Sequence, residues 1–247
     1  MTNKELADLL IPDVDSNIDY YEKLYKERNT EGVVTRFAPS PTGFVHMGSL
    51  LASFMENKAA NDTNGVFYLR IEDTDQKREV ENGIQGIIND LNYFNIKIDE
   101  GVVSETEEKG EYGPYIQSKR KTIYRTYAKH LIEEGLAYPC FCTPEEIEET
   151  RKMQEERKRR IGYYGHYAKC RRLTNEEIET KVKNGEPYII RFKSPGNYDN
   201  KVKVKDLIKG ELVFPENDLD IVIIKSDGLP TYHFAHAIDD HLMRTTH

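Results

Sequence analysis

Cysteine is scarce in this 247-residue chain, which has only Cys140, Cys142 and Cys170. An odd, small number of cysteines in a chain of this size argues against a disulfide framework. No apolar run approaches the roughly 20 residues that a membrane-spanning helix needs. The first ten residues include Glu5 and Asp8 and contain no small-residue cleavage site, so we expect no secretory signal. These absences predict a cytoplasmic protein with no membrane partner.

Positive charge is also in short supply. The chain has 35 Lys and Arg against 43 Asp and Glu, a formal net charge of -8. This balance argues against nucleic-acid binding through bulk electrostatics. A protein of this charge that binds RNA must gather its basic residues locally, and the sequence offers clusters at residues 119–121, 157–160, 169–172 and 201–205. Each cluster taken alone is equally consistent with a solvated face.

Neither of the common phosphate-binding loops is present, because the sequence contains no G-x-G-x-x-G and no G-x-x-x-x-G-K-[ST]. Residues 33–48 offer a different arrangement, V-V-T-R-F-A-P-S-P-T-G-F-V-H-M-G. Their first five residues have the β-branched and aromatic content of a buried strand. Pro39 and Pro41 then prevent further ladder pairing, since proline has no N–H to donate.

A helix is predicted to follow this strand directly. Thr42-Gly43 is a turn signal, and residues 49–60 are rich in Leu, Ala and Met. The helix N-terminus then lies near His46 and Gly48. Open α/β sheets bind nucleotides at such strand-to-helix turns, because the free amide groups and the dipole of the helix favour anions. A His at this place can donate a hydrogen bond to phosphate.

Other segments follow the same patterns. Residues 66–71 predict an apolar strand, and residues 80–94 predict a helix with isoleucines on one face. A capping box at residues 143–146 predicts a helix that runs to about Arg160. Residues 202–214 predict a β-hairpin. The length of 247 residues suits one large domain or two small ones.

Four motifs follow one another along the chain: P-S-P-T-G-x-x-H-x-G at residues 39–48, I-E-D-T-D at 71–75, G-P-Y-x-Q-S at 113–118 and P-T-Y-H-F-A-x-x-I-D-D-H at 230–241. In this order they resemble the class I aminoacyl-tRNA synthetases, in the form used by glutamyl-tRNA synthetases. The resemblance implies an α/β protein with the class I Rossmann-type nucleotide-binding fold. It also implies an inserted mixed α/β domain that receives the tRNA acceptor stem.

The same resemblance divides the chain into parts. We expect an N-terminal helical extension at residues 1–30, a Rossmann-type catalytic domain at 31–113 and 221–247, and an inserted tRNA acceptor-binding domain at 114–220. The implied enzyme is a glutamate–tRNA ligase, which activates L-glutamate with ATP and magnesium and transfers it to the 3′ end of tRNA. We expect a cytoplasmic monomer.

The resemblance also assigns site residues. ATP would bind at Pro39, Thr42, Gly43, His46 and Gly48, with His46 and Gly48 serving the reaction itself. The chemistry needs little covalent participation from the protein, since positioning and stabilisation of phosphate charge carry it.

Glutamate recognition would rest on a second set of residues. Arg36 would bind the side-chain carboxylate through two hydrogen bonds, whereas its alternative role is a surface salt bridge. Ser40 and Glu72 would hold the amino group, and Tyr232 would donate its hydroxyl. His236 stands where relatives often carry another polar residue. Ser40 favours the glutamate enzymes, because glutamine-specific relatives typically carry P-E-P-N-G where this chain has P-S-P-T-G.

The cysteines form a candidate zinc site. Cys140-x-Cys142 and Cys170, with His166 four residues before the last cysteine, resemble the zinc-binding residues of some family members. The second pair departs from the usual patterns, and several tyrosines lie nearby in the sequence. The alternative is a set of three reduced, partly buried thiols.

Two other functions remain open. Short relatives transfer glutamate to a modified base of an aspartate tRNA, as glutamyl-queuosine tRNA(Asp) synthetases do. A non-catalytic nucleic-acid or partner-binding remnant of a synthetase is the other alternative. The sequence lacks the K-M-S-K-S-like loop and the anticodon-binding region with which the family continues. We therefore expect an N-terminal portion of the enzyme that has little activity by itself.

Overall fold

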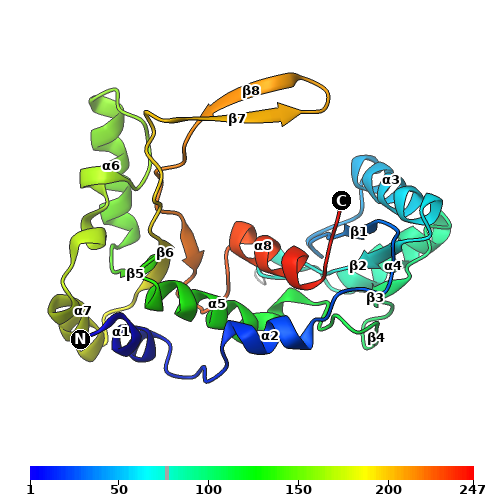
Figure 1. Ribbon diagram of the computed structural model, residues 1–247, viewed down its shortest axis with the longest axis horizontal. Helices are drawn as coiled ribbons and strands as arrows, with labels where there is room; N and C mark the ends of the chain where they lie inside the picture. Colours follow the sequence, from blue (N-terminus) through cyan, green and yellow to red (C-terminus); the bar gives the residue numbers. More distant parts are fainter. Residues whose placement is uncertain (76–77) are drawn as a thin grey trace. The chain divides into compact units, whose positions relative to one another are not determined.

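The computed structural model describes residues 1–75 and 78–247 (Figure 1). They divide into two compact units. One unit comprises Met1–Asp15 and Ala128–Gly228, and the other comprises Ser16–Tyr127 and Leu229–His247. Among the helices of the described residues, none combines the length and apolar character needed to cross a membrane.

The unit of Ser16–Tyr127 and Leu229–His247 is built on a four-stranded sheet. Its strands are β1 (Val34–Phe37), β2 (Val66–Leu69), β3 (Glu100–Val102) and β4 (Glu108–Lys109), in the order β1-β2-β3-β4. The first three strands are parallel, and β4 pairs antiparallel with β3. Two helices, α3 (Met47–Asp62) and α4 (Gly83–Tyr93), connect the parallel strands. This βαβ arrangement confirms the predicted α/β class.

The core of this unit lies between the sheet and its helices. Phe67, Tyr68 and Leu69 of β2 are fully buried, and α3 packs on β1 and β2. A strand that is buried on both faces has a nearly continuous apolar sequence, and this pattern predicted a strand at residues 66–71. The remaining elements are α2 (Ile18–Leu24), the 3-10 helix η2 (Gln117–Arg120), α5 (Lys121–Glu133), which continues into the other unit, and α8 (Tyr232–Leu242).

The predicted boundaries shift where the backbone leaves regular geometry. Helix α3 begins two residues earlier than the composition indicates, with His46 as its N-cap. Helix α4 begins at Gly83 rather than at residue 80, because Asn82 has a left-handed φ of 56°. Strand β2 ends at Leu69, and Ile71 instead forms an isolated parallel bridge with Ile116.

The unit of Met1–Asp15 and Ala128–Gly228 is mixed α/β. Its antiparallel sheet has the order β5-β6-β9, from β5 (Ala137–Cys140), β6 (Ile189–Phe192) and β9 (Val222–Ile224). A separate hairpin is formed by β7 (Lys201–Asp206) and β8 (Gly210–Pro215). Its helices are α1 (Asn3–Leu10), α6 (Pro144–Glu156) and α7 (Asn175–Lys183), with 3-10 turns η3 (Gly165–Tyr167) and η4 (Lys169–Arg172).

Helix α6 has the predicted start but a different end. Thr143 and Glu146 form the capping box, as predicted. The helix ends at Glu156 rather than near Arg160, because Lys158 adopts a left-handed φ of 52° and the amide of Arg159 turns back to Gln154. The charged residues 157–160 therefore lie in the loop that follows the helix.

Candidate active site

The turn from β1 into α3 encloses a cavity of about 410 Å³. Its lining includes Pro39, Ser40, Thr42, Gly43 and His46. Four of the five residues predicted to bind ATP therefore meet at one cavity. A Cβ added to Gly43 would find no atom within 4 Å, so the space beside this part of the loop is open.

His46 and Gly48 shape the start of α3. The Nδ1 atom of His46 accepts the backbone N–H of Ser49 at 3.3 Å, so the imidazole caps the helix. An accepting Nδ1 leaves the proton of the neutral ring on Nε2. A Cβ at Gly48 would lie 3.3 Å from His46 Nδ1, and glycine thus leaves room for the ring. The exposed His46 is placed to donate to an anion at the N-terminus of a 16-residue helix.

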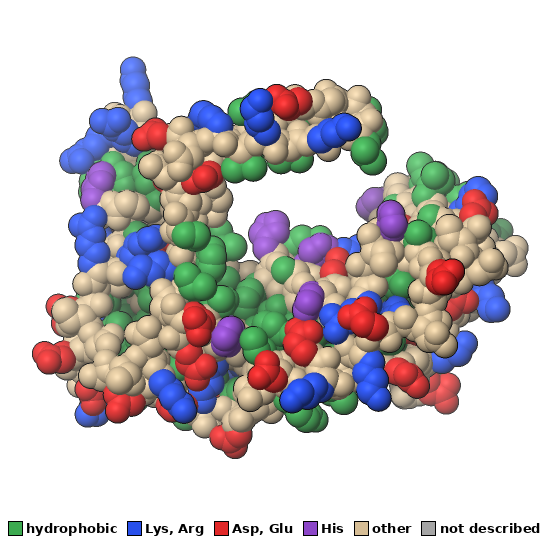
Figure 2. Space-filling view, viewed as in Figure 1, with side chains coloured by type: hydrophobic (Ala, Val, Ile, Leu, Met, Phe, Trp, Pro, Cys, Tyr) green, Lys and Arg blue, Asp and Glu red, His purple; other side chains and the backbone are tan. Residues whose placement is uncertain are grey.

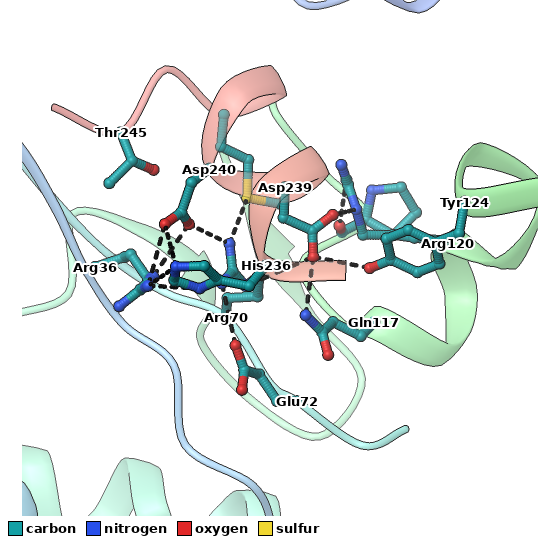
Figure 3. A network of polar contacts seen from close by, with 12 residues as sticks. Arg36, Arg70, Glu72, Gln117, Arg120, Tyr124, His236, Asp239, Asp240 and Thr245 are labelled. Carbon is teal, nitrogen blue, oxygen red and sulfur yellow. Dashed lines mark hydrogen bonds and ion pairs between the residues drawn. The ribbon is translucent and has the colours of Figure 1, made fainter. Parts of the chain in front are cut away.

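Arg36 lies on β1 and is fixed by helix α8. Its Nε and Nη2 atoms donate to Asp240 Oδ1 and Oδ2, each at 3.1 Å (Figure 3). Its Nη2 also lies 2.8 Å from His236 Nδ1. The Arg36 and Asp240 side chains are 21% and 24% exposed, so the salt bridge between them is partly buried. A guanidinium held along its Nε–Nη2 edge in this way keeps a fixed plane, and its Nη1 N–H groups can donate to a second carboxylate.

Arg70 connects this pair to the acidic residue after β2. Its fully buried guanidinium donates from Nη1 to Asp240 Oδ1 at 2.8 Å and from Nη2 to Glu72 Oε1 at 3.1 Å. Burial raises the pKa of Glu72, although Arg70 and Arg36 act against the rise. The backbone N–H of Glu72 also donates to Pro39 O at 3.0 Å, which links the carboxylate to the loop around the cavity.

Asp239 is the buried centre of the same network. It is 0% exposed and accepts Arg120 Nε at 2.7 Å, the Tyr124 hydroxyl at 2.8 Å and Gln117 Nε2 at 2.9 Å. Its Oδ2 lies 3.7 Å from Arg70 Nε. Buried ions are tolerated only when they are paired and hydrogen-bonded, and this carboxylate meets both conditions.

The network balances its charges. It joins three guanidinium groups to three carboxylates, namely Arg36, Arg70 and Arg120 with Glu72, Asp239 and Asp240. The sequence motifs gave no role to Arg70, Arg120, Asp239 or Asp240. The available signal was an arginine within the apolar run V-F-Y-L-R-I, because an Arg buried there requires an acidic partner.

The remaining predicted glutamate contacts lie at the edges of this network. Tyr232 is 55% exposed, and its ring stacks on His236 with centroids 5.6 Å apart. Burial lowers the pKa of His236, so the neutral ring can accept a hydrogen bond from Arg36. Ser40 is exposed beside the cavity. The structure thus brings Arg36, Glu72 and His236 into one network and leaves Ser40 and Tyr232 accessible.

Glu56 of α3 predicts a pH effect on stability. Its Oε2 atom is buried without a hydrogen-bond partner, and burial raises the pKa to about 7 from the ordinary 4.5. The folded protein therefore binds more protons than the unfolded chain between these values, so stability falls as pH rises from about 4.5 to about 7. We expect Glu56→Gln to remove about 1–2 kcal/mol of this fall, allowing for partial solvent screening.

Urea unfolding at pH 5 and pH 8 measures this difference. Glu81→Gln, at an exposed position just before α4, is the matched control. It should leave the difference in unfolding free energy between pH 5 and pH 8 unchanged. If Glu56→Gln left the difference in unfolding free energy between pH 5 and pH 8 unchanged, Glu56 would ionise normally in the folded protein.

A thiol cluster lies in the unit of Met1–Asp15 and Ala128–Gly228. The sulfur atoms of Cys140, Cys142 and Cys170 all lie within 4.8 Å of one another, and Cys142 Sγ is 3.6 Å from Cys170 Sγ. Two sulfurs on a tetrahedral zinc ion are separated by about 3.8 Å. Hydrogen bonds from the other two thiols lower the pKa of Cys140 and favour its thiolate. The spacing and the chemistry of this donor set fit zinc.

The fourth position of the cluster holds a tyrosine hydroxyl. Tyr163 Oη lies 3.4 Å from Cys140 Sγ and 3.3 Å from Cys142 Sγ, and it accepts the backbone N–H of Cys170 at 3.0 Å. His166, the fourth residue expected from the sequence, is exposed and lies against Tyr167 with ring centroids 3.9 Å apart. Among the described residues, the group whose ligand atoms lie close enough together to hold a metal ion consists of the three cysteines, without His166.

The hairpin of β7 and β8 has two unlike faces. Lys201, Lys203 and Lys205 alternate with Val202 and Val204 along β7, and successive side chains of a strand point to opposite faces. Figure 2 shows Lys and Arg side chains along one side of the hairpin and hydrophobic ones along the other. The basic cluster at residues 201–205 is therefore gathered on one face of an exposed ribbon.

Known proteins share this architecture. The family described as "tRNA synthetases class I (E and Q), catalytic domain" matches residues 32–247. The glutamate–tRNA ligases of Clostridium beijerinckii and Acetivibrio thermocellus are 54% and 50% identical, over all of this chain and 45% and 46% of theirs. A crystal structure of a glutamate tRNA ligase from Elizabethkingia meningosepticum, in complex with its amino acid, matches with a TM-score of 0.78 and 38% identity. That match covers 88% of this chain and 43% of the other.

These matches confirm the expected class I synthetase fold. The chain spans a little under half the length of the curated relatives that it matches.

Proposed function

Because this chain belongs to the class I tRNA synthetases for glutamate and glutamine and carries their catalytic domain, we propose that the protein activates L-glutamate with ATP for transfer to the 3′ end of tRNA. The observation that carries the proposal is Arg36, a guanidinium fixed by Asp240 and placed on the strand that leads into the cavity. A fixed guanidinium of this kind, which donates hydrogen bonds and accepts none, suits a carboxylate side chain better than an amide.

Each charged group of the substrates is bound by residues of complementary charge or polarity. ATP lies along the start of α3, where His46, the loop and the helix N-terminus favour its phosphates. The α-carboxylate of glutamate then attacks the α-phosphate, releasing pyrophosphate and forming glutamyl-adenylate. Arg36 holds the side-chain carboxylate of glutamate, and Glu72, with Ser40, holds its ammonium group. Magnesium bound together with the nucleotide would neutralise part of the phosphate charge.

In this proposal the unit of Met1–Asp15 and Ala128–Gly228 contacts the RNA. Its hairpin presents three lysines on one face of a β-ribbon, which suits a phosphate backbone despite the net charge of -8. The ribose hydroxyl at the tRNA end attacks the mixed anhydride, so the protein has only to bring the two substrates together.

Calorimetric titration and tRNA charging test this proposal. The product of the full gene should bind ATP and glutamate, and it should charge the 3′ end of a glutamate tRNA. Transfer of glutamate to a base within an aspartate tRNA would instead support the glutamyl-queuosine alternative. Absence of ATP binding in the presence of tRNA would support the non-catalytic remnant and overturn the enzyme proposal.

We also propose that the thiol cluster binds one structural zinc ion, held by Cys140, Cys142, Cys170 and the Tyr163 oxygen. Zinc would cross-link β5 to the loop that carries η4. We expect elemental analysis to find about one zinc per chain. Substitution of residues that only support the ligands weakens metal binding roughly 10–100-fold. Cys142→Ser removes a ligand, so it should weaken zinc binding by more than that.

The fourth ligand is tested separately. Tyr163→Phe should lower zinc affinity, whereas His166→Ala should leave it unchanged. If His166→Ala lowered zinc affinity and Tyr163→Phe did not, His166 would be the fourth ligand. If the protein contained no zinc and a chelator left its melting temperature unchanged, the cysteines would be ordinary reduced thiols.

A further inference from the structure

The segment Ser16–Thr30 has no part in the catalytic proposal, and it precedes the family match, which begins at residue 32. It contains α2 and the loop that leads to β1. Tyr21 and Tyr25 of this segment are buried, although most of their neighbours in the sequence are exposed. The segment is therefore packed into the unit rather than attached loosely to it.

Several polar contacts join this segment to the C-terminal end of α8. Arg28 Nε donates to the backbone oxygen of Met243 at 2.8 Å. Arg244 Nη2 donates to the backbone oxygen of Tyr25 at 2.8 Å. Glu22 Oε1 lies 2.7 Å from His241 Nε2. Carbonyl groups at a helix end lack partners within the helix, so the Arg28 contact satisfies one of them directly.

Arg28 is itself anchored to the sheet. Its Nη1 donates to both carboxylate oxygens of Glu100 on β3, at 2.9 and 3.0 Å. Its guanidinium lies 3.8 Å from the ring centroid of Tyr112, and its side chain is only 6% exposed. A planar guanidinium that is both paired and stacked holds one geometry. Arg28 thus ties the end of α8 to a central strand.

Tyr25 connects the segment to the buried network. Its hydroxyl donates to Gly113 O at 2.9 Å and accepts from Arg120 Nη1 at 3.4 Å. Arg120 in turn donates to Asp239 Oδ1 at 2.7 Å. The segment therefore reaches α8 by two routes, one at the helix end and one through the carboxylate of Asp239.

We propose that Ser16–Thr30 is a positioning segment for glutamate recognition, which fixes α8 so that His236 and Asp240 hold Arg36 in its binding orientation. This inference rests on the proposed function of Arg36. Asp240 lies only three residues before Met243, about 4.5 Å along the helix axis, so a displaced helix end moves the partner of Arg36 directly. The ATP-binding turn follows β1, and it meets this network through one backbone hydrogen bond, from the N–H of Glu72 to Pro39 O.

Two variants and one control test the positioning role in the product of the full gene. Arg28→Met keeps the apolar stem but loses the contacts to Met243 and Glu100. Glu22→Gln removes the negative charge that faces His241 and Arg244, keeps an oxygen that can accept the Tyr127 hydroxyl, and should fold normally. Lys23→Gln, at the adjacent exposed position on α2, is the matched control.

Kinetics of tRNA-dependent activation and hydrogen exchange of α8 are the two measurements. We expect the KM for glutamate to rise about 10-fold in Arg28→Met and about two- to threefold in Glu22→Gln, with the KM for ATP unchanged. Amide exchange in α8 should rise in the same order. Lys23→Gln should change neither quantity.

Different outcomes test the positioning role of Ser16–Thr30 and the proposed use of glutamate as substrate. Unchanged α8 exchange and unchanged glutamate KM in both variants would overturn the positioning role, and so would equal changes in the KM values for glutamate and ATP. Failure of the unaltered protein to use glutamate would instead overturn the proposed function.

Discussion

Replacing Arg36 with alanine should lower kcat/KM for glutamate by about two to four orders of magnitude, equivalent to roughly 3–5 kcal/mol. Truncation removes the guanidinium that would donate to the substrate carboxylate, and it also leaves Asp240 without one of its two guanidinium partners. Arg36→Lys should lose nearly as much, because an ammonium group cannot reproduce the paired N–H geometry. Steady-state activation by the product of the full gene, with tRNA present, measures the loss.

Tyr232→Phe is the control for this prediction. It removes one hydroxyl from an exposed side chain and keeps the ring that stacks on His236, so its loss should be much smaller. The KM for ATP should change little in any of these variants. Near-normal glutamate use by Arg36→Ala would show that the substrate assignment is wrong, while the class I fold would still stand.

Asp239→Ala should destabilise the protein by about 3–5 kcal/mol. The substitution leaves the fully buried guanidinium of Arg120 without its carboxylate partner and deprives Gln117 and Tyr124 of an acceptor. An uncompensated buried charge costs far more than the loss of an exposed pair. Urea unfolding at neutral pH measures the change in the free energy of unfolding.

Asp62→Ala provides the comparison for Asp239. Asp62 pairs with Lys58 on the surface of α3, and both side chains are more than half exposed. Its loss should change stability by no more than about 0.5 kcal/mol. A similarly small effect of Asp239→Ala would mean that the network does not hold α8 in place.

Local features of the fold could be predicted from the sequence. The two prolines, the Thr-Gly turn and the Leu- and Ala-rich run predicted the strand, turn and helix between Val34 and Asp62, and the capping box predicted the start of α6. The end of α6 was missed, because the charged residues that continue its pattern carry no proline or glycine, and the chain turns at Lys158 through a left-handed φ.

Pairings between distant residues could not be predicted in this way. The motifs indicated Arg36 as a binding residue, but its partner Asp240 lies 204 residues away and no periodicity links the two. The buried pair of Arg120 and Asp239 is separated by 119 residues. Likewise, sequence spacing favoured His166 as a neighbour of the thiols, whereas the 3-10 turns bring the Tyr163 hydroxyl to them instead.

Amino-acid-dependent exchange of pyrophosphate into ATP, with tRNA present, tests the central claim most directly. The product of the full gene should catalyse exchange with L-glutamate, much less with L-glutamine, and the glutamate rate should collapse in Arg36→Ala. Equal or faster exchange with glutamine, or a glutamate rate that does not depend on Arg36, would contradict the proposed role of this arginine and the substrate that it selects.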